Sequence, residues 1–123
     1  MSDNGSVSMY FLGDELFASS ESDIVRRVDP STLATHPIPT RHSTHLAVTN
    51  LTAHPHYDAQ TGDVFNMGNI FTKGYYYNIV RLPKALRSSQ AYDKGKVVAS
   101  LRAANSLKPS YYHSFGLTDR YLV

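Results

Sequence analysis

Two histidines separated by a single proline are the residues of this sequence whose types and spacing most directly suggest chemistry. They are His54 and His56 in the stretch "NLTAHPHYD", residues 50–58. If this stretch is extended, both imidazoles project from the same face, because alternate side chains of a strand share a face. Pro55 donates no backbone hydrogen bond, so the stretch is expected at a strand end, an edge or a bulge. A metal site and an ordinary polar strand end both fit the pattern, since imidazole is a common metal ligand and the spacing also arises by chance.

Two further residues are candidates for the same site. His113 lies in "KPSYYHSFG", where flanking aromatic residues predict that it is at least half-buried. A histidine in such a place is either a hydrogen-bonded core residue or a ligand. Glu21 lies in "FASSES", at the end of an expected strand. It could accept the free N–H of a metal-bound imidazole, which would fix the tautomer, or it could be an exposed strand-end carboxylate.

The other histidines carry less information. His36, His42 and His45 lie in polar or proline-containing stretches and are expected at the surface. The motifs HExxH, G-x-S-x-G, the Walker loop and GxGxxG are absent, so the common signatures of zinc proteases, serine hydrolases and nucleotide-binding folds give no alternative assignment.

The composition is that of a globular protein. The chain has 123 residues, of which 41% are hydrophobic and 18% charged. A net charge of +2 with scattered basic residues gives no indication of nucleic-acid binding. The chain has no cysteine, which excludes thiolate metal sites and disulfides and favours a reducing, cytoplasmic location. It has no apolar run of about 20 residues, the length that a membrane-spanning helix needs, and its first residues do not resemble a signal peptide.

The elements that must position the candidate residues are predicted to be strands. Short β-prone runs are separated by turn signals such as Gly13-Asp14; they cover residues 7–12, 15–20, 24–28, 44–54, 64–71, 75–83, 96–103, 110–115 and 120–123. Residues 84–95 are predicted to be a loop or a short helical turn, and no window sustains an amphipathic helix. The fold class is therefore all-β, and a sandwich, a barrel and a propeller all fit the pattern. Because the last residues, "RYLV", stop inside an apolar strand pattern, we expect the chain to be a piece of a longer one.

Several of these stretches together resemble the carotenoid cleavage oxygenases, a family that includes β-carotene oxygenases, insect isomerooxygenases and a retinoid isomerohydrolase. The resemblance rests on "TAHPH", "NMG", "YNIVRLP" and above all "KPSYYHSFGLTDRYLV". The earlier stretch "GDELFASSESDIVRRVDPSTL" is similar to the strand pair that precedes the first signature in the family. The combination is specific, and it covers nearly the whole chain.

The resemblance implies a fold and a metal site. The family fold is a seven-bladed β-propeller of roughly four times this length, so residues 1–123 would form about two blades, without the N-terminal region and the C-terminal blades. Ferrous iron, Fe²⁺, lies on the propeller axis of the family and is held by four histidines. His54 matches the first ligand and His113 the second, while His56 matches a position near the metal that is not a ligand. Glu21 matches a glutamate that hydrogen-bonds the ligand aligned with His113.

The resemblance also implies an activity and its partners. The family's oxygenases cleave a carotenoid or apocarotenoid double bond with O₂ and give carbonyl products of the retinal type. The substrate enters through an apolar tunnel that opens on a membrane-binding patch, so peripheral membrane contact is expected. Residues 71–77 and 106–108 would approach this entrance, although the tyrosines of the first segment could instead pack between blades. Two alternatives stay open: a truncated chain that is not catalytic on its own, and a parent with retinoid isomerohydrolase-like activity.

Overall fold

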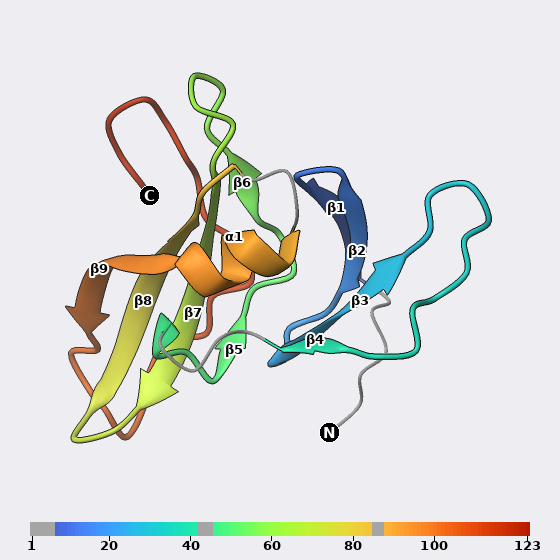
Figure 1. Cartoon of the computed structure of the whole chain (residues 1–123). Helices are drawn as coiled ribbons and strands as arrows, with labels where there is room; N and C mark the ends of the chain where they lie inside the picture. The colour runs from blue at the N-terminus through green and yellow to red at the C-terminus, as the bar shows by residue number, and fades with distance from the viewer. Residues whose placement is uncertain (1–6, 42–45, 85–87) are drawn as a thin grey trace.

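The computed structural model describes residues 7–41, 46–84 and 88–123. In these residues nine strands and one short helix form two antiparallel sheets that lie next to each other (Figure 1). The prediction of a chain made mostly of β-strands is confirmed. The propeller, with about two blades in this chain, stays a prediction.

The first sheet is a meander with the strand order β1-β2-β3-β4. Its strands are β1 (Ser8–Leu12), β2 (Glu15–Ser19), β3 (Ile24–Val28) and β4 (Thr40–Arg41). β1 and β2 are joined at the predicted two-residue turn, where Gly13 has a φ of 65° that a residue with a side chain rarely adopts. Glu21 lies two residues after the end of β2, in the short connection to β3, so its carboxylate lies at a strand end as predicted.

The second sheet has the order β5-β7-β8-β9, and β6 pairs with β7 as well. Its strands are β5 (Asn50–Leu51), β6 (His56–Tyr57), β7 (Val64–Phe71), β8 (Tyr75–Leu82) and β9 (Lys96–Arg102). β7 and β8 form the longest pair and were predicted with nearly these bounds, because both are rich in β-branched and aromatic residues. β5 and β6 pair with successive parts of β7, and residues 52–55 lie between them.

The main core lies where the two sheets and the helix α1 (Ser88–Lys94) meet. The first sheet contributes Tyr10 and Phe17, the second sheet contributes Val80, and the helix contributes Tyr92. The hydroxyl oxygens of Tyr10 and Tyr92 lie 2.5 Å apart, so one buried hydroxyl donates a hydrogen bond to the other. The helix itself falls in the region predicted to be a loop or a short helical turn. It fixes the position of the first sheet against the second.

The last part of the chain, residues 103–123, returns over the second sheet (Figure 1). Phe115 packs on its face against Met67 of β7 and Ile79 of β8. The strand predicted at residues 110–115 is wrong, because this segment crosses the face of the sheet and makes no ladder with an edge strand. Of the pair of strands predicted around the "GLTD" turn, only one isolated bridge forms, between Leu117 and Leu122. His113 is therefore presented from an irregular segment.

Candidate metal centre

His54 lies in the interruption between β5 and β6. The ladder with β7 ends at Leu51, and a last backbone hydrogen bond runs from Thr52 N to Met67 O at 2.8 Å. Pro55 cannot donate the next bond, so the backbone leaves the sheet here and the half-buried His54 side chain is free to point away from β7. The strand end that the proline predicts is therefore confirmed. The two histidines around the proline lie in different places, because His54 is in the gap between β5 and β6 and His56 is the first residue of β6.

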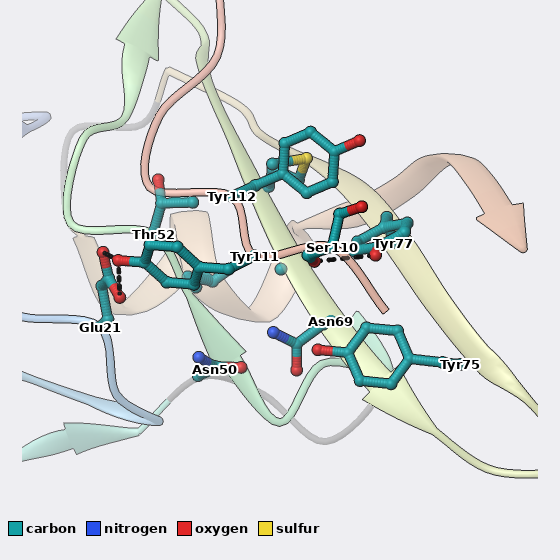
Figure 2. Close-up of a pocket in the computed structure, with 12 residues that line it drawn as sticks. Glu21, Asn50, Thr52, Asn69, Tyr75, Tyr77, Ser110, Tyr111 and Tyr112 are labelled. Atoms are coloured by element: carbon teal, nitrogen blue, oxygen red, sulfur yellow. Dashed lines mark hydrogen bonds between the residues drawn. The ribbon is translucent and has the colours of Figure 1, made fainter. Parts of the chain in front are cut away.

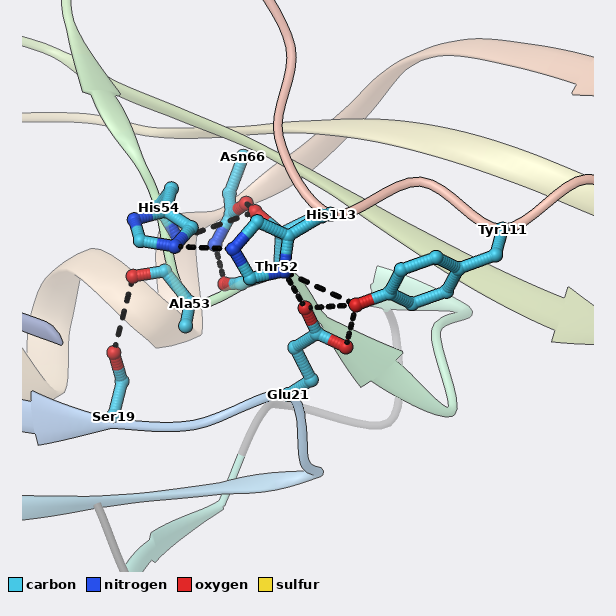
Figure 3. Close-up of polar contacts among 8 residues, drawn as sticks. All are labelled: Ser19, Glu21, Thr52, Ala53, His54, Asn66, Tyr111 and His113. Carbon is cyan, nitrogen blue, oxygen red and sulfur yellow. Dashed lines mark hydrogen bonds and ion pairs between the residues drawn. The ribbon is translucent and has the colours of Figure 1, made fainter. Parts of the chain in front are cut away.

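The imidazoles of His54 and His113 face each other although 59 residues separate them in the chain. Their Nε2 atoms lie 2.9 Å apart, and their ring centroids are 4.6 Å apart (Figure 3). The His113 side chain is 55% exposed, more than the flanking aromatic residues predict. The difference arises because Tyr111 and Tyr112 are themselves exposed and do not cover it.

Glu21 completes the arrangement from the first sheet. Its Oε1 lies 2.5 Å from His113 Nδ1. This contact assigns the Nδ1 proton to the bond with the carboxylate and leaves the lone pair of His113 Nε2 directed at His54. The hydroxyl of Tyr111 donates to the same carboxylate, at 2.6 and 2.7 Å from its two oxygens. The carboxylate raises the pKa of Tyr111 above its ordinary value, because it accepts the phenolic proton in a hydrogen bond.

The donor set fits a transition-metal ion. Two imidazole nitrogens bound at about 2.0–2.1 Å and at right angles to each other would be about 3 Å apart, close to the observed separation of the two Nε2 atoms. Imidazole donors suit iron, zinc, copper and nickel, whereas calcium and magnesium require oxygen ligands. In residues 7–41, 46–84 and 88–123, no group of three or more histidine, cysteine, aspartate or glutamate side chains could hold a metal ion. The described residues therefore offer two facing imidazole nitrogens and one carboxylate that contacts the second imidazole.

The two remaining histidines that the structure describes, His36 and His56, make contacts with other residues. His56 begins β6, and its ring packs against Phe115 with centroids 4.6 Å apart. Its Nε2 is buried and has no hydrogen-bond partner in the described part of the chain. His36 lies in the loop between β3 and β4, where its Nδ1 accepts a hydrogen bond from Ile38 N. His42 and His45 fall outside the described residues.

A pocket rich in tyrosine lies beside Glu21. Figure 2 shows Tyr75 and Tyr77 of β8 on one side, with Tyr111 between them and the carboxylate. The two segments predicted near a substrate entrance are in contact, since Tyr75 N donates to Ser106 Oγ at 3.1 Å. Their role as an entrance stays a prediction. No helix in the described part of the chain is long and apolar enough to cross a membrane.

Three residues near the site were not singled out from the sequence. Tyr111 was noted only as an aromatic neighbour of His113, although it contacts both Glu21 and His113. Thr52 and Asn66 form a buried hydrogen-bonded pair next to His54. The sequence contained one signal for Asn66: it lies inside a strongly β-prone run, where a polar side chain requires a hydrogen-bond partner if it is buried.

Comparison with known proteins places the chain in a family. The family model described as "Retinal pigment epithelial membrane protein" matches residues 1–123. Together with the relatives below, this match shows that the chain belongs to the family of that protein and of the carotenoid oxygenases, as the resemblance predicted.

Curated relatives agree with this assignment. The chain is 36% identical over 127 residues to a beta,beta-carotene 15,15'-dioxygenase of Gallus gallus, covering 98% of this chain and 24% of the relative. It is 35% identical over 126 residues to a mitochondrial carotenoid-cleaving dioxygenase of Mustela putorius furo, covering 100% and 23%. It is 32% identical over 124 residues to a carotenoid isomerooxygenase of Galleria mellonella, covering 100% and 24%. The chain thus spans about a quarter of the length of the curated relatives it matches.

Proposed function

We propose that this chain is a segment of a non-haem Fe(II) oxygenase that cleaves a double bond of a carotenoid or apocarotenoid with O₂. One observation carries the proposal: the Nε2 atoms of His54 and His113 converge at 2.9 Å while Glu21 fixes the tautomer of His113 from behind. The names of the relatives support the choice of carotenoids as the substrate class. Because the chain spans about a quarter of these relatives, the activity belongs to the intact protein, meaning the whole polypeptide that contains it.

His54 and His113 would each donate a neutral imidazole to the iron, and further ligands would come from the rest of the intact protein. When bound, the ferrous ion supplies the one-electron chemistry that makes O₂ reactive toward a polyene. Glu21 would hold the ring of His113 in place, because its carboxylate accepts a hydrogen bond from Nδ1. His56 lies next to the ligand segment and shapes the apolar surroundings through its contact with Phe115.

The reaction balances without another reductant or co-substrate. The carbon–carbon double bond breaks, each of its two carbons gains one oxygen atom of O₂, and two carbonyl products form. The tyrosine-lined pocket next to Glu21 and the exposed side chains of Phe71 and Leu107 support an apolar substrate that arrives at this side. Exposed apolar residues of this kind are also consistent with a cytoplasmic protein that contacts a membrane at its surface.

Substitution of the two ligands in the intact protein tests the proposal. His54→Ala and His113→Ala are expected to lose bound iron, measured by elemental analysis, and to lose formation of aldehyde products from β-carotene. His36→Ala is the matched control, because His36 Nδ1 accepts a hydrogen bond from Ile38 N within its own loop. Normal iron content and normal cleavage in either ligand variant would overturn the assignment.

Isotope labelling separates the proposed reaction from ester hydrolysis. With ¹⁸O₂ as the oxidant, each carbonyl product is expected to contain one labelled oxygen when exchange with water is suppressed. A retinoid isomerohydrolase-like activity on a retinyl ester would give an unlabelled alcohol and acid. Unlabelled products would therefore overturn the oxygenase assignment, even if iron is bound.

A further inference from the structure

The side chain of Asn66 lies opposite the interruption in the sheet from which His54 emerges. Backbone pairing with β7 stops at Leu51, which pairs with Gly68, and resumes at His56, which pairs with Phe65. Asn66 lies on β7 between these two pairing positions and is only 3% exposed. The sheet therefore loses its regular hydrogen bonds at the point where the proposed ligand leaves it.

Hydrogen bonds of the Asn66 amide take the place of the missing ladder. Its Nδ2 donates to Thr52 O at 2.9 Å, and its Oδ1 accepts from Thr52 Oγ1 at 2.7 Å and from Met67 N at 2.8 Å. The Thr52 hydroxyl in turn accepts from His54 N at 3.3 Å (Figure 3). A continuous set of hydrogen bonds thus connects the middle of β7 with the backbone of His54.

We propose that Asn66 is a positioning residue for His54, acting through Thr52. This inference rests on the proposed function, because it assigns to Asn66 the task of orienting an iron ligand. A ligand has to be held within about 0.5 Å of its productive place, and Pro55 removes the backbone bond that would otherwise fix this segment. The amide is suited to the task, because it presents a donor to Thr52 O and an acceptor to the Thr52 hydroxyl at once.

A merely structural role for Asn66 can be separated from a positioning role, because the same sheet contains a matched asparagine. Asn78 on the neighbouring strand β8 is 4% exposed. Its Nδ2 donates to Ala47 O at 2.6 Å and its Oδ1 accepts from Ser100 Oγ at 2.7 Å. Asn78 is therefore buried and hydrogen-bonded to a similar extent, but none of these bonds reaches the segment that holds His54.

The experiment compares Asn66→Asp with Asn78→Asp in the intact protein. Each change replaces an amide donor by a carboxylate oxygen that faces a carbonyl, so both are expected to lower the thermal unfolding temperature. Only Asn66→Asp is expected to speed the loss of Fe²⁺ to a chelator, by about 10–100-fold. It is also expected to speed amide hydrogen exchange of residues 52–54 and 56 in the metal-free protein, a readout that needs no activity. Unchanged iron loss in Asn66→Asp, or an equal increase in both variants, would overturn the inference.

If Asn66→Asp fails to fold, a second pair of variants tests whether His54 is positioned through Thr52. Thr52→Val removes the hydroxyl and keeps the shape of the side chain, and this variant is expected to lose iron faster than the parent. Thr52→Ser keeps the hydroxyl and is expected to lose iron at the rate of the parent. Equal iron loss in the two would overturn the inference. The outcome is distinguishable from failure of the proposed function: if His54→Ala abolishes iron binding while these variants leave it unchanged, only the inference about Asn66 fails.

Discussion

The hydroxyl of Tyr111 is hydrogen-bonded to both carboxylate oxygens of Glu21, at 2.6 and 2.7 Å, and lies 3.1 Å from Nδ1 of His113. The carboxylate thus accepts hydrogen bonds from a tyrosine hydroxyl and from a histidine N–H of the same short segment. Its rotation is restricted by two partners, so the direction in which it holds His113 is defined by more than a single bond.

Removal of the Tyr111 hydroxyl is expected to loosen this carboxylate without removing it. In the intact protein, Tyr111→Phe should speed Fe²⁺ loss to a chelator several-fold, and Glu21→Gln should speed it by about 10–100-fold, because the variant amide replaces the charged acceptor. Tyr112→Phe is the matched control, since the ring of Tyr112 packs on Tyr77 and lies outside the contact with Glu21. An equal effect of the two phenylalanine variants would contradict the role given to the Tyr111 hydroxyl.

A methyl group added at Gly68 is expected to separate β5 from β7. A Cβ atom built there would clash with Asn50 O and would lie 2.8 Å from Val48 Cγ1, and the first contact is with backbone that cannot rotate away. Gly68→Ala should therefore destabilise the intact protein by about 1–3 kcal/mol in urea unfolding. It should also reduce iron content, because β5 leads directly into the segment that carries His54.

Gly116→Ala is the control for this prediction. A Cβ atom there would meet its nearest neighbour, Val123 O, at an ordinary contact distance of 3.7 Å. Its effect on unfolding is expected to be within about 0.5 kcal/mol, the usual range for a substitution that meets no obstacle. If Gly68→Ala were as well tolerated as Gly116→Ala, the close approach of β5 to β7 would not be required for stability.

The buried tyrosine pair in the core predicts a loss of stability in alkali. Burial raises the pKa of Tyr10 to about 12 from 10.0, and burial next to Tyr10 raises the pKa of Tyr92 well above its ordinary value. Between pH 10 and pH 12 the unfolded chain releases the proton of Tyr10 and the folded chain keeps it. The contribution of protonated Tyr10 to the stability of the fold is thus fully present below pH 10 and is lost as the pH rises to about 12. A pKa shift of this size corresponds to about 3 kcal/mol.

Urea unfolding of the intact protein between pH 9 and pH 12 measures this effect. The double variant Tyr10→Phe/Tyr92→Phe keeps both rings in the core and removes the titrating groups. Its stability should decline less steeply with pH than that of the parent. Equal slopes for the parent and the double variant would show that other groups cause the alkaline loss.

The strands that could be predicted are those whose signal is local. β3, β7 and β8 follow from runs of β-branched and aromatic residues, and their bounds agree closely with the prediction. The strand predicted at residues 44–54 is much shorter in the described part of the chain, where only β5 (Asn50–Leu51) forms, and β6 (His56–Tyr57) begins after Pro55. Residues 110–115 have strand propensity as well, but tertiary packing of Phe115 on the face of the second sheet determines their path.

The candidate site was only partly accessible from the sequence. Spacing treated His54 and His56 alike, and only the resemblance to a family distinguished them and paired His54 with His113. No local pattern in the sequence shows that Glu21 of the β2–β3 connection, His54 and His113 lie close together, because the packing of the two sheets and the C-terminal segment creates this proximity. Asn66 was overlooked for the same reason, since its importance arises from the gap opposite it and not from its neighbours in the chain.

The 59-residue separation of His54 and His113 also has a consequence for synthesis on the ribosome. At about 5–20 residues per second, His54 is made roughly 3–12 s before His113. During this interval β7, β8 and β9 can pair, because they follow one another along the chain with short connections. Glu21 precedes both histidines and is already present when His113 emerges. The sheet that supports the proposed metal pair can thus be in place before His113 is added and the pair forms.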